Sequence, residues 1–252
     1  ITNYLTGHKF TDPSGGYTYG DTFDRPEGSL RAAADQWIDG SWNESVGGHI
    51  STWDTSEVTD FSFLFYQKYD FNEDLSHWDV SSGTSMERMF ATWSDYNQPM
   101  GDWDVSSVRD MSHMFEGYAG SNFNQDISEW DVSSVTDMKN MFNKAIAFNQ
   151  PLNKWRVDNV TDMTRMFYGD TSSLGSGGIH PFSQPLFQWN VSKVTSMSEM
   201  FRDSLFNQDI SGWDTTTAAN NFTWNNWPLT FDMFLNCPIS EENKAPGSVI
   251  RN

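Results

Sequence analysis

Tryptophans recur at nearly even spacing through most of this 252-residue chain. Consecutive members lie about 25 residues apart, which is a period typical of repeat proteins. The seven positions are Trp53, Trp78, Trp103, Trp130, Trp155, Trp189 and Trp213. Such a period indicates a solenoid, because one short unit cannot bury its apolar face and must stack on copies of itself. The repeat therefore constrains the architecture far more than it constrains the function.

Each repeat combines an extended pattern with a helical one. Trp130 and Val132 lie two residues apart, so both side chains share one face of an extended segment and predict a short strand. The spacing i, i+3, i+6 and i+7 of one helix face follows at Val135, Met138, Met141 and Phe142. A Ser-x-x-Asp pattern before this set suits a helix start. We therefore expect an α/β solenoid of strand, turn and short helix.

The ends of the chain depart from the repeat and predict caps. Residues 29–40 predict a helix that Ser29 caps and Gly40 ends. The expected parts are a lead-in with this capping helix over 1–47, a seven-repeat solenoid over 48–213, and a C-terminal cap and tail over 214–252. Exposure of Trp224, Trp227 and Phe234 in a poorly closed C-terminal cap would favour an assembly of chains.

The charge of the chain excludes two classes of partner. With 34 acidic and 15 basic residues the formal net charge is −19, and nucleic acids and anionic membranes are bound through Lys and Arg. No apolar run approaches the roughly 20 residues of a membrane span. We expect neither nucleic-acid binding nor membrane insertion. Cys237 is the one cysteine, so no internal disulfide can form, and a start at Ile1 suggests a processed chain or a fragment.

The repeat resembles a known group of surface proteins. Residues 123–138 read FNQDISEWDVSSVTDM, and Met141-Phe142 complete the copy. This string resembles the BspA-like leucine-rich-repeat surface proteins and, more closely, the mycoplasma-type lipoprotein repeat once classed as a domain of unknown function. Residues 29–33 and 50–54 are similar to copies in marine algae and protists. The resemblance implies a leucine-rich-repeat-like, right-handed stack of about seven repeats, secreted or on the cell surface, with roles in adhesion and protein binding.

Carboxylates follow most of the tryptophans and form a ladder in the expected stack. Stacked carboxylates repel one another unless something compensates. One interpretation is a Ca²⁺ site, because this ion takes several oxygen ligands; the other is that each Asp accepts from the N–H groups of its own following turn. No other cofactor is expected. The ladder consists of Asp54, Asp79, Asp104 and Asp131.

The residue before each tryptophan varies in chemistry, in contrast to the core positions. Solenoids bind partners on extended surfaces of this kind, although an ordinary solvated face would vary in the same way. The candidate partner-binding residues are His77, Asp102, Glu129, Lys154 and Gln188. In most repeats an aromatic lies seven residues before the tryptophan and an Asn lies six residues before it. We expect these Asn side chains to be buried and to tie successive turns through backbone groups.

Four Asn-x-Ser/Thr sequons occur, and a eukaryotic secreted protein would carry glycans on them. Chance is the alternative, because Asn, Ser and Thr are abundant in the repeats. The sequons are Asn43, Asn159, Asn190 and Asn221. Two insertions also break the period, within residues 117–121 and 169–180, and insertions in repeats often carry the binding face.

Enzyme motifs are missing from the sequence. The tryptophans and carboxylates recur in nearly every unit, which one active site would not require, and the five histidines lack metal-ligand spacing. We therefore expect a non-catalytic scaffold that binds a protein or glycan partner at the cell surface or outside the cell. A structural subunit of a larger assembly is the first alternative, and a carbohydrate-active enzyme is the second.

Overall fold

The structure, a computed structural model, describes residues 9–11, 29–92, 95–117, 121–172, 178–220 and 232–246. Regular elements are few in these ranges. In chain order they are strand β1 (Lys9–Thr11), helix α1 (Leu30–Asp39), helix α2 (Glu44–Gly47), 3₁₀ helix η1 (Ile50–Thr52), strand β2 (Asp54–Glu57), helix α3 (Thr216–Asn220) and 3₁₀ helix η2 (Glu241–Asn243).

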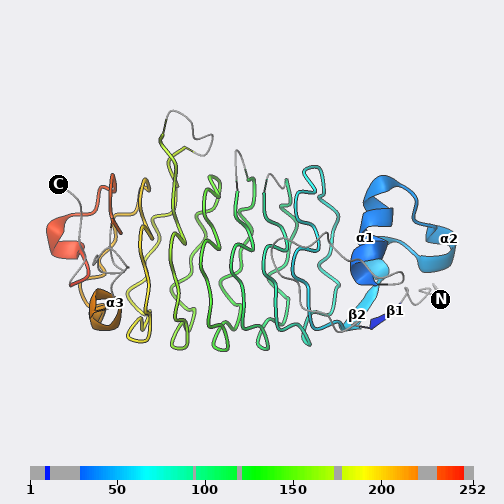
Figure 1. The fold of residues 1–252 in the computed structure, drawn as a ribbon, viewed down its shortest axis with the longest axis horizontal. Helices are drawn as coiled ribbons and strands as arrows, with labels where there is room; N and C mark the ends of the chain where they lie inside the picture. Colours follow the sequence, from blue (N-terminus) through cyan, green and yellow to red (C-terminus); the bar gives the residue numbers. More distant parts are fainter. Residues whose placement is uncertain are drawn as a thin grey trace.

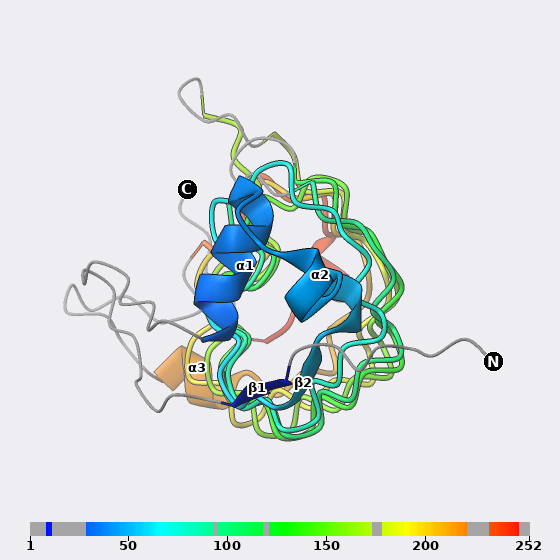
Figure 2. The ribbon, with the colours of Figure 1, turned by 90° about the vertical axis from the view of Figure 1, so that its right-hand side faces the viewer.

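Successive repeats form coils that lie side by side along the long axis of the molecule (Figure 1). Viewed along that axis, the coils overlay one another as nested loops (Figure 2). Neighbouring coils are joined by single-residue parallel β-bridges that run Asp60–Ser85, Ser85–Asp110, Asp110–Asp137, Asp137–Asp162 and Asp162–Ser196. The leucine-rich-repeat-like class and the right-handed sense of this stack stay predictions.

The short helix expected in each repeat is replaced by a run of tight turns, which we call the turn ladder. In the coil of Trp130 the turn ladder covers residues 138–145. Alternate N–H groups, those of residues 138, 140, 142 and 144, donate to carbonyls of the next coil at 2.7–3.1 Å. The N–H groups between them, those of residues 141, 143 and 145, donate three residues back at 3.0–3.1 Å. Every second bond thus joins two coils, which an α-helix could not do.

Left-handed residues make this alternation possible. Asn140 and Lys144 have φ values of 55° and 57°, and matching residues recur in the other coils. A helix needs consecutive right-handed residues, so these positions break it. Between Trp53 and Trp213 no described residue belongs to an α-helix. The helix prediction for the repeats is therefore wrong, and Ser134 and Asp137 do not form a capping box.

The strand expected around each tryptophan is present in the first coil alone among the described residues. There β2 pairs in parallel with β1. In the coil of Trp130 the N–H of Trp130 donates to Ile127 at 3.2 Å, and the N–H of Val135 donates to Val132 at 3.0 Å. These turn bonds use the donors that a sheet would need, so most backbone hydrogen bonds between coils lie at the bridges and in the turn ladder.

Stacked aromatic rings fill the inside of the coils. Phe115, Phe142 and Phe167 lie in one column with ring centroids 5.7 Å apart. Phe123 and Phe148 lie in a second column at 5.8 Å, and Phe142 contacts Phe148 across the columns at 4.0 Å. All of these rings are buried, as are the methionines and valines that the period predicted for the core. Burial of this apolar surface is the main stabilising term for the stack.

An asparagine ladder ties the coils at their outer edge, as predicted. Asn124 accepts from the N–H of Asn149 at 3.0 Å and from Gln150 Nε2 at 3.1 Å, while its own N–H donates to Asn97 Oδ1 at 2.9 Å. The ladder residues are half-buried or exposed. We expected them to be buried, so this part of the prediction is wrong.

Helix α1 closes the N-terminal end of the stack (Figure 2). It has the predicted caps, because the Ser29 side chain accepts from the N–H of Ala32 and Gly40 takes a left-handed φ of 77°. Buried Arg31 fastens the helix to the first coil, donating to the Ser62 carbonyl at 2.7 and 2.9 Å and pairing with Asp60 at 3.1 Å.

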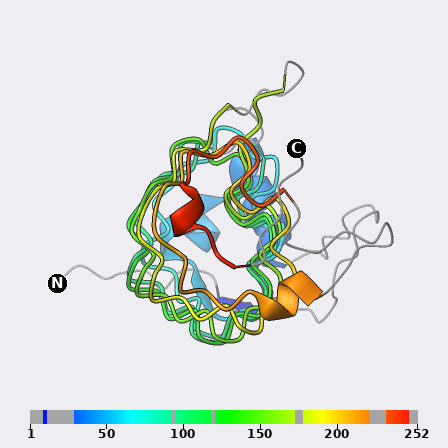
Figure 3. The same cartoon turned by 90° about the vertical axis from the view of Figure 1, so that its left-hand side faces the viewer.

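Residues 232–246 close the other end (Figure 3). The N–H of Phe201 donates to Met233 at 2.9 Å, and Phe234 stacks on Phe201 at 5.8 Å. Asp232 and Asn236 repeat the left-handed positions of the turn ladder. The cap thus continues the stack with a partial coil and buries Phe234. Trp224 and Trp227 lie outside the described residues.

Candidate functional site

The left-handed positions of the turn ladder carry a different side chain in almost every coil. We call the turn-ladder face the set formed by the first left-handed position of each coil and the residue three places further along. Its two columns are Phe63, Arg88, His113, Asn140, Arg165 and Glu199, and Tyr66, Ala91, Glu116, Asn143, Tyr168 and Arg202. Phe63, Ala91, Asn140 and Asn143 are buried, and the others are half-buried or exposed. Variation on an otherwise repetitive frame makes this face the best candidate for specific recognition.

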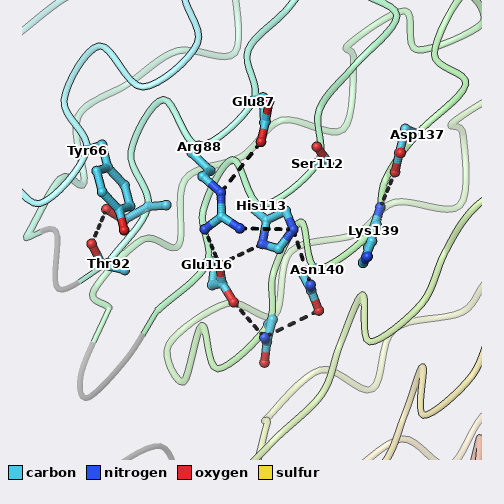
Figure 4. Close-up of polar contacts among 12 residues, drawn as sticks. Tyr66, Glu87, Arg88, Thr92, Ser112, His113, Glu116, Asp137, Lys139 and Asn140 are labelled. Carbon is cyan, nitrogen blue, oxygen red and sulfur yellow. Dashed lines mark hydrogen bonds and ion pairs between the residues drawn. The ribbon is translucent and has the colours of Figure 1, made fainter. Parts of the chain in front are cut away.

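Arg88, His113 and Glu116 form a polar cluster on this face (Figure 4). Glu116 Oε2 accepts from His113 Nδ1 at 2.7 Å and from Arg88 Nη1 at 3.2 Å. Arg88 Nε also pairs with Glu87 at 3.5 Å. Burial, reinforced by the charge of Asp110, raises the pKa of Glu87. The cluster links two adjacent coils and holds its side chains in fixed orientations.

The contacts of His113 define its hydrogen-bonding roles. Its Nε2 lies 3.3 Å from both Arg88 Nη2 and Asn140 Nδ2 (Figure 4). Both neighbours are donors, so Nε2 must accept, and the proton belongs on Nδ1, which faces Glu116. In this arrangement the Nε2 lone pair is already engaged. A general base needs that lone pair to reach a substrate proton, so the geometry argues against catalysis by His113.

A second cluster occupies the same face three coils further along. Arg165 and Arg202 both pair with Glu199. Their guanidinium groups lie 5.3 and 5.8 Å from the ring centroid of Tyr168, within the range of cation–π attraction. Burial raises the pKa of Tyr168, partly offset by Arg202.

The bridge residues form an acidic column beside the turn ladder. Burial is the main cause that raises the pKa of Asp137, and the charges of Asp110 and Asp162 raise it further. The N–H of Lys139 donates to Asp137 Oδ1 at 2.8 Å. Asp110 and Asp162 cap their own turns in the same way, accepting from Ser112 and Thr164 at 2.8 Å. Each carboxylate therefore has a local structural role.

The aspartate ladder, which was a candidate calcium site, has the geometry of the second interpretation: each Asp accepts hydrogen bonds from its own following turn. Asp104 Oδ1 accepts from the N–H and the hydroxyl of Ser106 at 3.0 and 2.6 Å. Asp54 and Asp79 make the same pair of bonds to Ser56 and Ser81, and Asp131 accepts from the N–H of Ser133. Hydrogen bonds from the serines lower the pKa of Asp54, Asp104 and Asp131. Within the described ranges, no three His, Cys, Asp or Glu side chains gather where they could hold a metal ion.

The candidate partner-binding residues lie where the sequence predicts, on the surface. His77, Asp102, Glu129, Lys154 and Gln188 are all exposed. Lys154 pairs with Glu129 in the preceding coil. The column before the tryptophans is therefore accessible, but ion pairs hold fewer of its side chains than they hold on the turn-ladder face.

Three of the four sequons lie within the described residues, and all three are exposed. Asn43 caps α2, Asn159 Nδ2 donates to Ser133 at 2.8 Å, and Asn190 Oδ1 accepts from Ser192 at 3.2 Å. Asn221 lies outside the described residues.

The longer insertion begins as a short hairpin. Asp170 and Gly178 exchange backbone hydrogen bonds of 2.7 and 2.8 Å. Lys144 Nζ contacts Asp170 Oδ2 at 2.8 Å, and this bond is the main cause that lowers the pKa of Asp170 to about 2. Behind the hairpin His180 is fully buried and contacts the Phe142 carbonyl at 2.9 Å through Nε2. Burial lowers its pKa to about 4. Residues 118–120 and 173–177 of the insertions lie outside the described residues.

Sequence reasoning missed the turn-ladder face. We expected a helix over these positions and assigned no role to the residues between the apolar ones. A usable signal was present, because the position ten residues after each tryptophan changes from Phe to Arg, His, Asn, Arg and Glu along the chain.

None of the helices in the described part has the length and apolar character of a membrane crossing.

A protein-family model matches most of the chain. The family described as "Mycoplasma protein of unknown function, DUF285" matches residues 38–120, 118–177 and 177–226. The three matches overlap end to end and cover the coils described above. No curated protein and no solved structure matches the chain.

Proposed function

The chain belongs to the DUF285 family of Mycoplasma-type repeat proteins, and on that premise we propose that it is a non-catalytic scaffold that binds a protein or glycan partner. The observation that carries the proposal is the turn-ladder face. Core positions repeat from coil to coil, whereas the left-handed positions of this face do not. Variation at a fixed place on a repetitive frame suits the extended surfaces on which solenoids bind partners.

The composition of the face suits recognition. Tyr and Arg are enriched at the energetic centres of protein interfaces, and Tyr66, Arg88, Tyr168 and Arg202 all lie here. Ion pairs and ring contacts already order these side chains in the free protein. Pre-ordering lowers the entropy that binding has to overcome.

The proposal places the protein at the cell surface or outside the cell, as the resemblance to BspA-like proteins and to algal copies implies. Adhesion, secretion and the leucine-rich-repeat class belong to the same proposal. The exposed sequons at Asn43, Asn159 and Asn190 are compatible with it, since glycosylation requires accessible Asn side chains.

The alternatives have less support. Burial of Phe234 removes one feature that would have favoured end-to-end assembly. The engaged lone pair of His113 and the turn-capping roles of the ladder aspartates argue against a carbohydrate-active enzyme.

Binding of the labelled chain to arrays of glycans and of purified extracellular proteins tests the proposal. We expect a specific signal that is lost in the double variant Arg88→Gln and Arg202→Gln, which alters the turn-ladder face. The matched control is the double variant His77→Gln and Lys154→Gln in the column before the tryptophans. Loss in the control alone would move the binding surface to that column, and absence of any saturable signal would contradict a binding role.

A further inference from the structure

A pocket of about 410 Å³ opens at the N-terminal end of the turn ladder, between the last turn of α1 and residues 67–73 of the first coil. Its volume lies within the range of ligand sites, which run from about 300 to 1,000 Å³. The helix contributes Trp37 and Ile38 to the lining, and the coil segment begins at Gln67, a left-handed position of the turn ladder. The pocket therefore adjoins the turn-ladder face, because Gln67 directly follows Tyr66.

Two side-chain contacts hold this coil segment against the N-terminal cap. Lys68 Nζ pairs with Asp35 Oδ1 at 2.8 Å. His49 Nε2 lies 3.9 Å from Glu73 Oε2, and the His49 ring contacts the Trp37 ring at a centroid distance of 4.5 Å. The Glu73 carboxylate therefore lies on the side of the segment that faces Trp37.

Negative charge is in excess around the pocket. Lys68 brings a positive charge to the lining, and Asp35 already neutralises it. The exposed Asp70 carboxylate makes no hydrogen bond or ion pair within the ranges that the structure describes. The Glu73 side chain is 43% exposed, and its 3.9 Å contact with His49 is too long for a hydrogen bond. A cation would therefore meet two accessible carboxylates with unused acceptors.

The end of α1 adds to the preference for a cation. The C-terminal end of a helix carries a partial negative charge and attracts positive groups within its last turn. No basic residue lies in the last turn of α1, to which Trp37 and Ile38 belong. The position that a Lys or Arg of the helix itself could fill is thus open to a cation from outside.

Aromatic and aliphatic side chains supply the rest of the contact surface. Tyr69 is 49% exposed and Ile38 is 37% exposed, so both lining residues have accessible surface. Trp37 is half-buried, and its ring contact with Trp53 at 6.4 Å holds the indole in place. Cations bind the faces of Trp and Tyr rings, and the carbon stem of a Lys or Arg side chain packs along apolar groups.

We propose that this pocket receives a basic side chain, an Arg or a Lys, of a protein partner. The charged head pairs with Asp70 and Glu73 beside the end of α1, and the stem packs on Ile38 and the aromatic rings. A neutral sugar can stack on the rings, but it brings no positive charge to the two carboxylates. This inference rests on the proposed binding function and assigns a protein, rather than a glycan, to this end of the turn ladder.

Saturation-transfer difference NMR with small probes tests the inference directly. The cationic probes are N-acetyl-arginine methylamide and N-acetyl-lysine methylamide, and the uncharged control is N-acetyl-citrulline methylamide, which has nearly the shape of the arginine probe. We expect a cationic probe to bind the wild type about tenfold more tightly than the citrulline probe. Its binding should weaken as NaCl is raised from about 20 to about 300 mM, because salt screens exposed charges. Methylguanidinium and methyl glucoside complete the set.

The double variant Asp70→Asn and Glu73→Gln removes both carboxylates and keeps the size of the side chains. We expect it to bind the cationic probes about tenfold more weakly than the wild type does. The matched control is the double variant Asp102→Asn and Glu242→Gln, which removes the same charge from exposed positions outside the pocket. The control should bind as the wild type does.

A third variant covers the case in which the Asp70 and Glu73 changes prevent folding. Tyr69→Ala truncates a ring that is half exposed, so the stack should persist, and the cationic probes should again bind more weakly. Its control is Phe187→Ala, which truncates a 66% exposed ring in the coil of Trp189. Melting curves report on the folding of each variant.

Three results would overturn the inference: no saturable binding of either cationic probe, equal binding of the citrulline probe, or equal affinities in the wild type and the folded pocket variants. Binding of methylguanidinium without either capped amino acid would overturn the protein side chain as the source, and binding of methyl glucoside alone would replace the cation by a sugar. Array binding that survives the Asp70 and Glu73 changes but is lost with the Arg88 and Arg202 changes would leave the proposed function standing without the cation pocket.

Discussion

The indole N–H of Trp130 donates a 2.9 Å hydrogen bond to the backbone carbonyl of Met100 in the preceding coil. The same bond recurs through the stack at 2.8–3.1 Å, joining Trp78 to Ile50, Trp103 to Leu75, Trp155 to Ile127, Trp189 to Leu152 and Trp213 to Leu186. Each tryptophan therefore fills the core of its own coil and satisfies a buried carbonyl of its neighbour. This double role explains why the position stays Trp when other aromatics would fill similar space.

Replacement of Trp130 by Phe should destabilise the stack. The variant leaves the Met100 carbonyl buried without a donor, so the free energy of unfolding should fall by about 1–3 kcal/mol. Urea unfolding followed by circular dichroism measures the change. Trp37→Phe is the control, because the indole N–H of Trp37 has no hydrogen-bond partner among the described residues. Equal losses in the two variants would contradict a specific role for the Trp130 bond.

The asparagine ladder allows a second test. In Asn124→Ala the N–H of Asn149 and the Gln150 amide lose the oxygen that accepts from both. We expect a loss of about 1 kcal/mol, because the site is half-buried and water can replace part of the bonding. Asn124→Asp keeps an acceptor oxygen and should recover most of the stability in the same urea titration. If Asn124→Asp is as unstable as Asn124→Ala, the Nδ2 group of Asn124, and not its oxygen, stabilises the stack.

Burial of His180 predicts a pH dependence of stability. The folded protein lowers the pKa of this side chain to about 4 from its ordinary value of 6.5. Between these values the unfolded chain binds more protons, so acid favours unfolding. The contribution of neutral His180 is therefore fully present above about pH 6.5 and is lost progressively as the pH falls to about 4.

Guanidinium titrations at pH 7, 5.5 and 4.5 measure this effect. The wild type should lose up to about 3 kcal/mol more than His180→Asn over this interval, because the amide does not titrate. Carboxylates titrate in both proteins, so the difference between them isolates His180. Parallel pH profiles would show that His180 does not titrate as its burial predicts.

The turn-capping geometry of the aspartate ladder predicts indifference to calcium. Asp104 is already held by two donors from Ser106, so the melting temperature and the mass by light scattering should be equal with 1 mM Ca²⁺ and with chelator. Asp104→Ala should cost less than about 1 kcal/mol, because the residue is exposed. A calcium-dependent rise in melting temperature that Asp104→Asn abolishes would restore the cation interpretation.

The sequence period could predict much of the packing. A Trp, Val, Met and Phe set that recurs about every 25 residues can be buried in one way, by stacking each unit on the next. The buried residues Trp130, Val135, Met138 and Phe142 follow from that argument, and so do α1 and its caps at Ser29 and Gly40. Asx turns at the ladder aspartates also follow, because an Asp two residues before a Ser favours them locally.

The backbone path between those core positions could not be predicted in the same way. The spacing of Met138, Met141 and Phe142 fits one face of a helix, and it also fits successive tight turns that return the same side chains to the core. Left-handed φ values at Arg88, His113 and Arg165 leave no mark in the sequence, since such residues seldom adopt them. Hydrogen bonds to the neighbouring coil stabilise these conformations, and local propensity does not report on them.

The sequence by itself determined the repeat, the core and the N-terminal cap of this protein, because apolar periodicity records what each unit must bury. The tertiary structure alone decided the turn ladder and the polar face that it presents. The cluster of Arg88, His113 and Glu116 and the hydrogen bond from Asn143 to Glu116 join residues about one repeat apart. Only stacking of the coils brings such distant side chains within hydrogen-bonding distance.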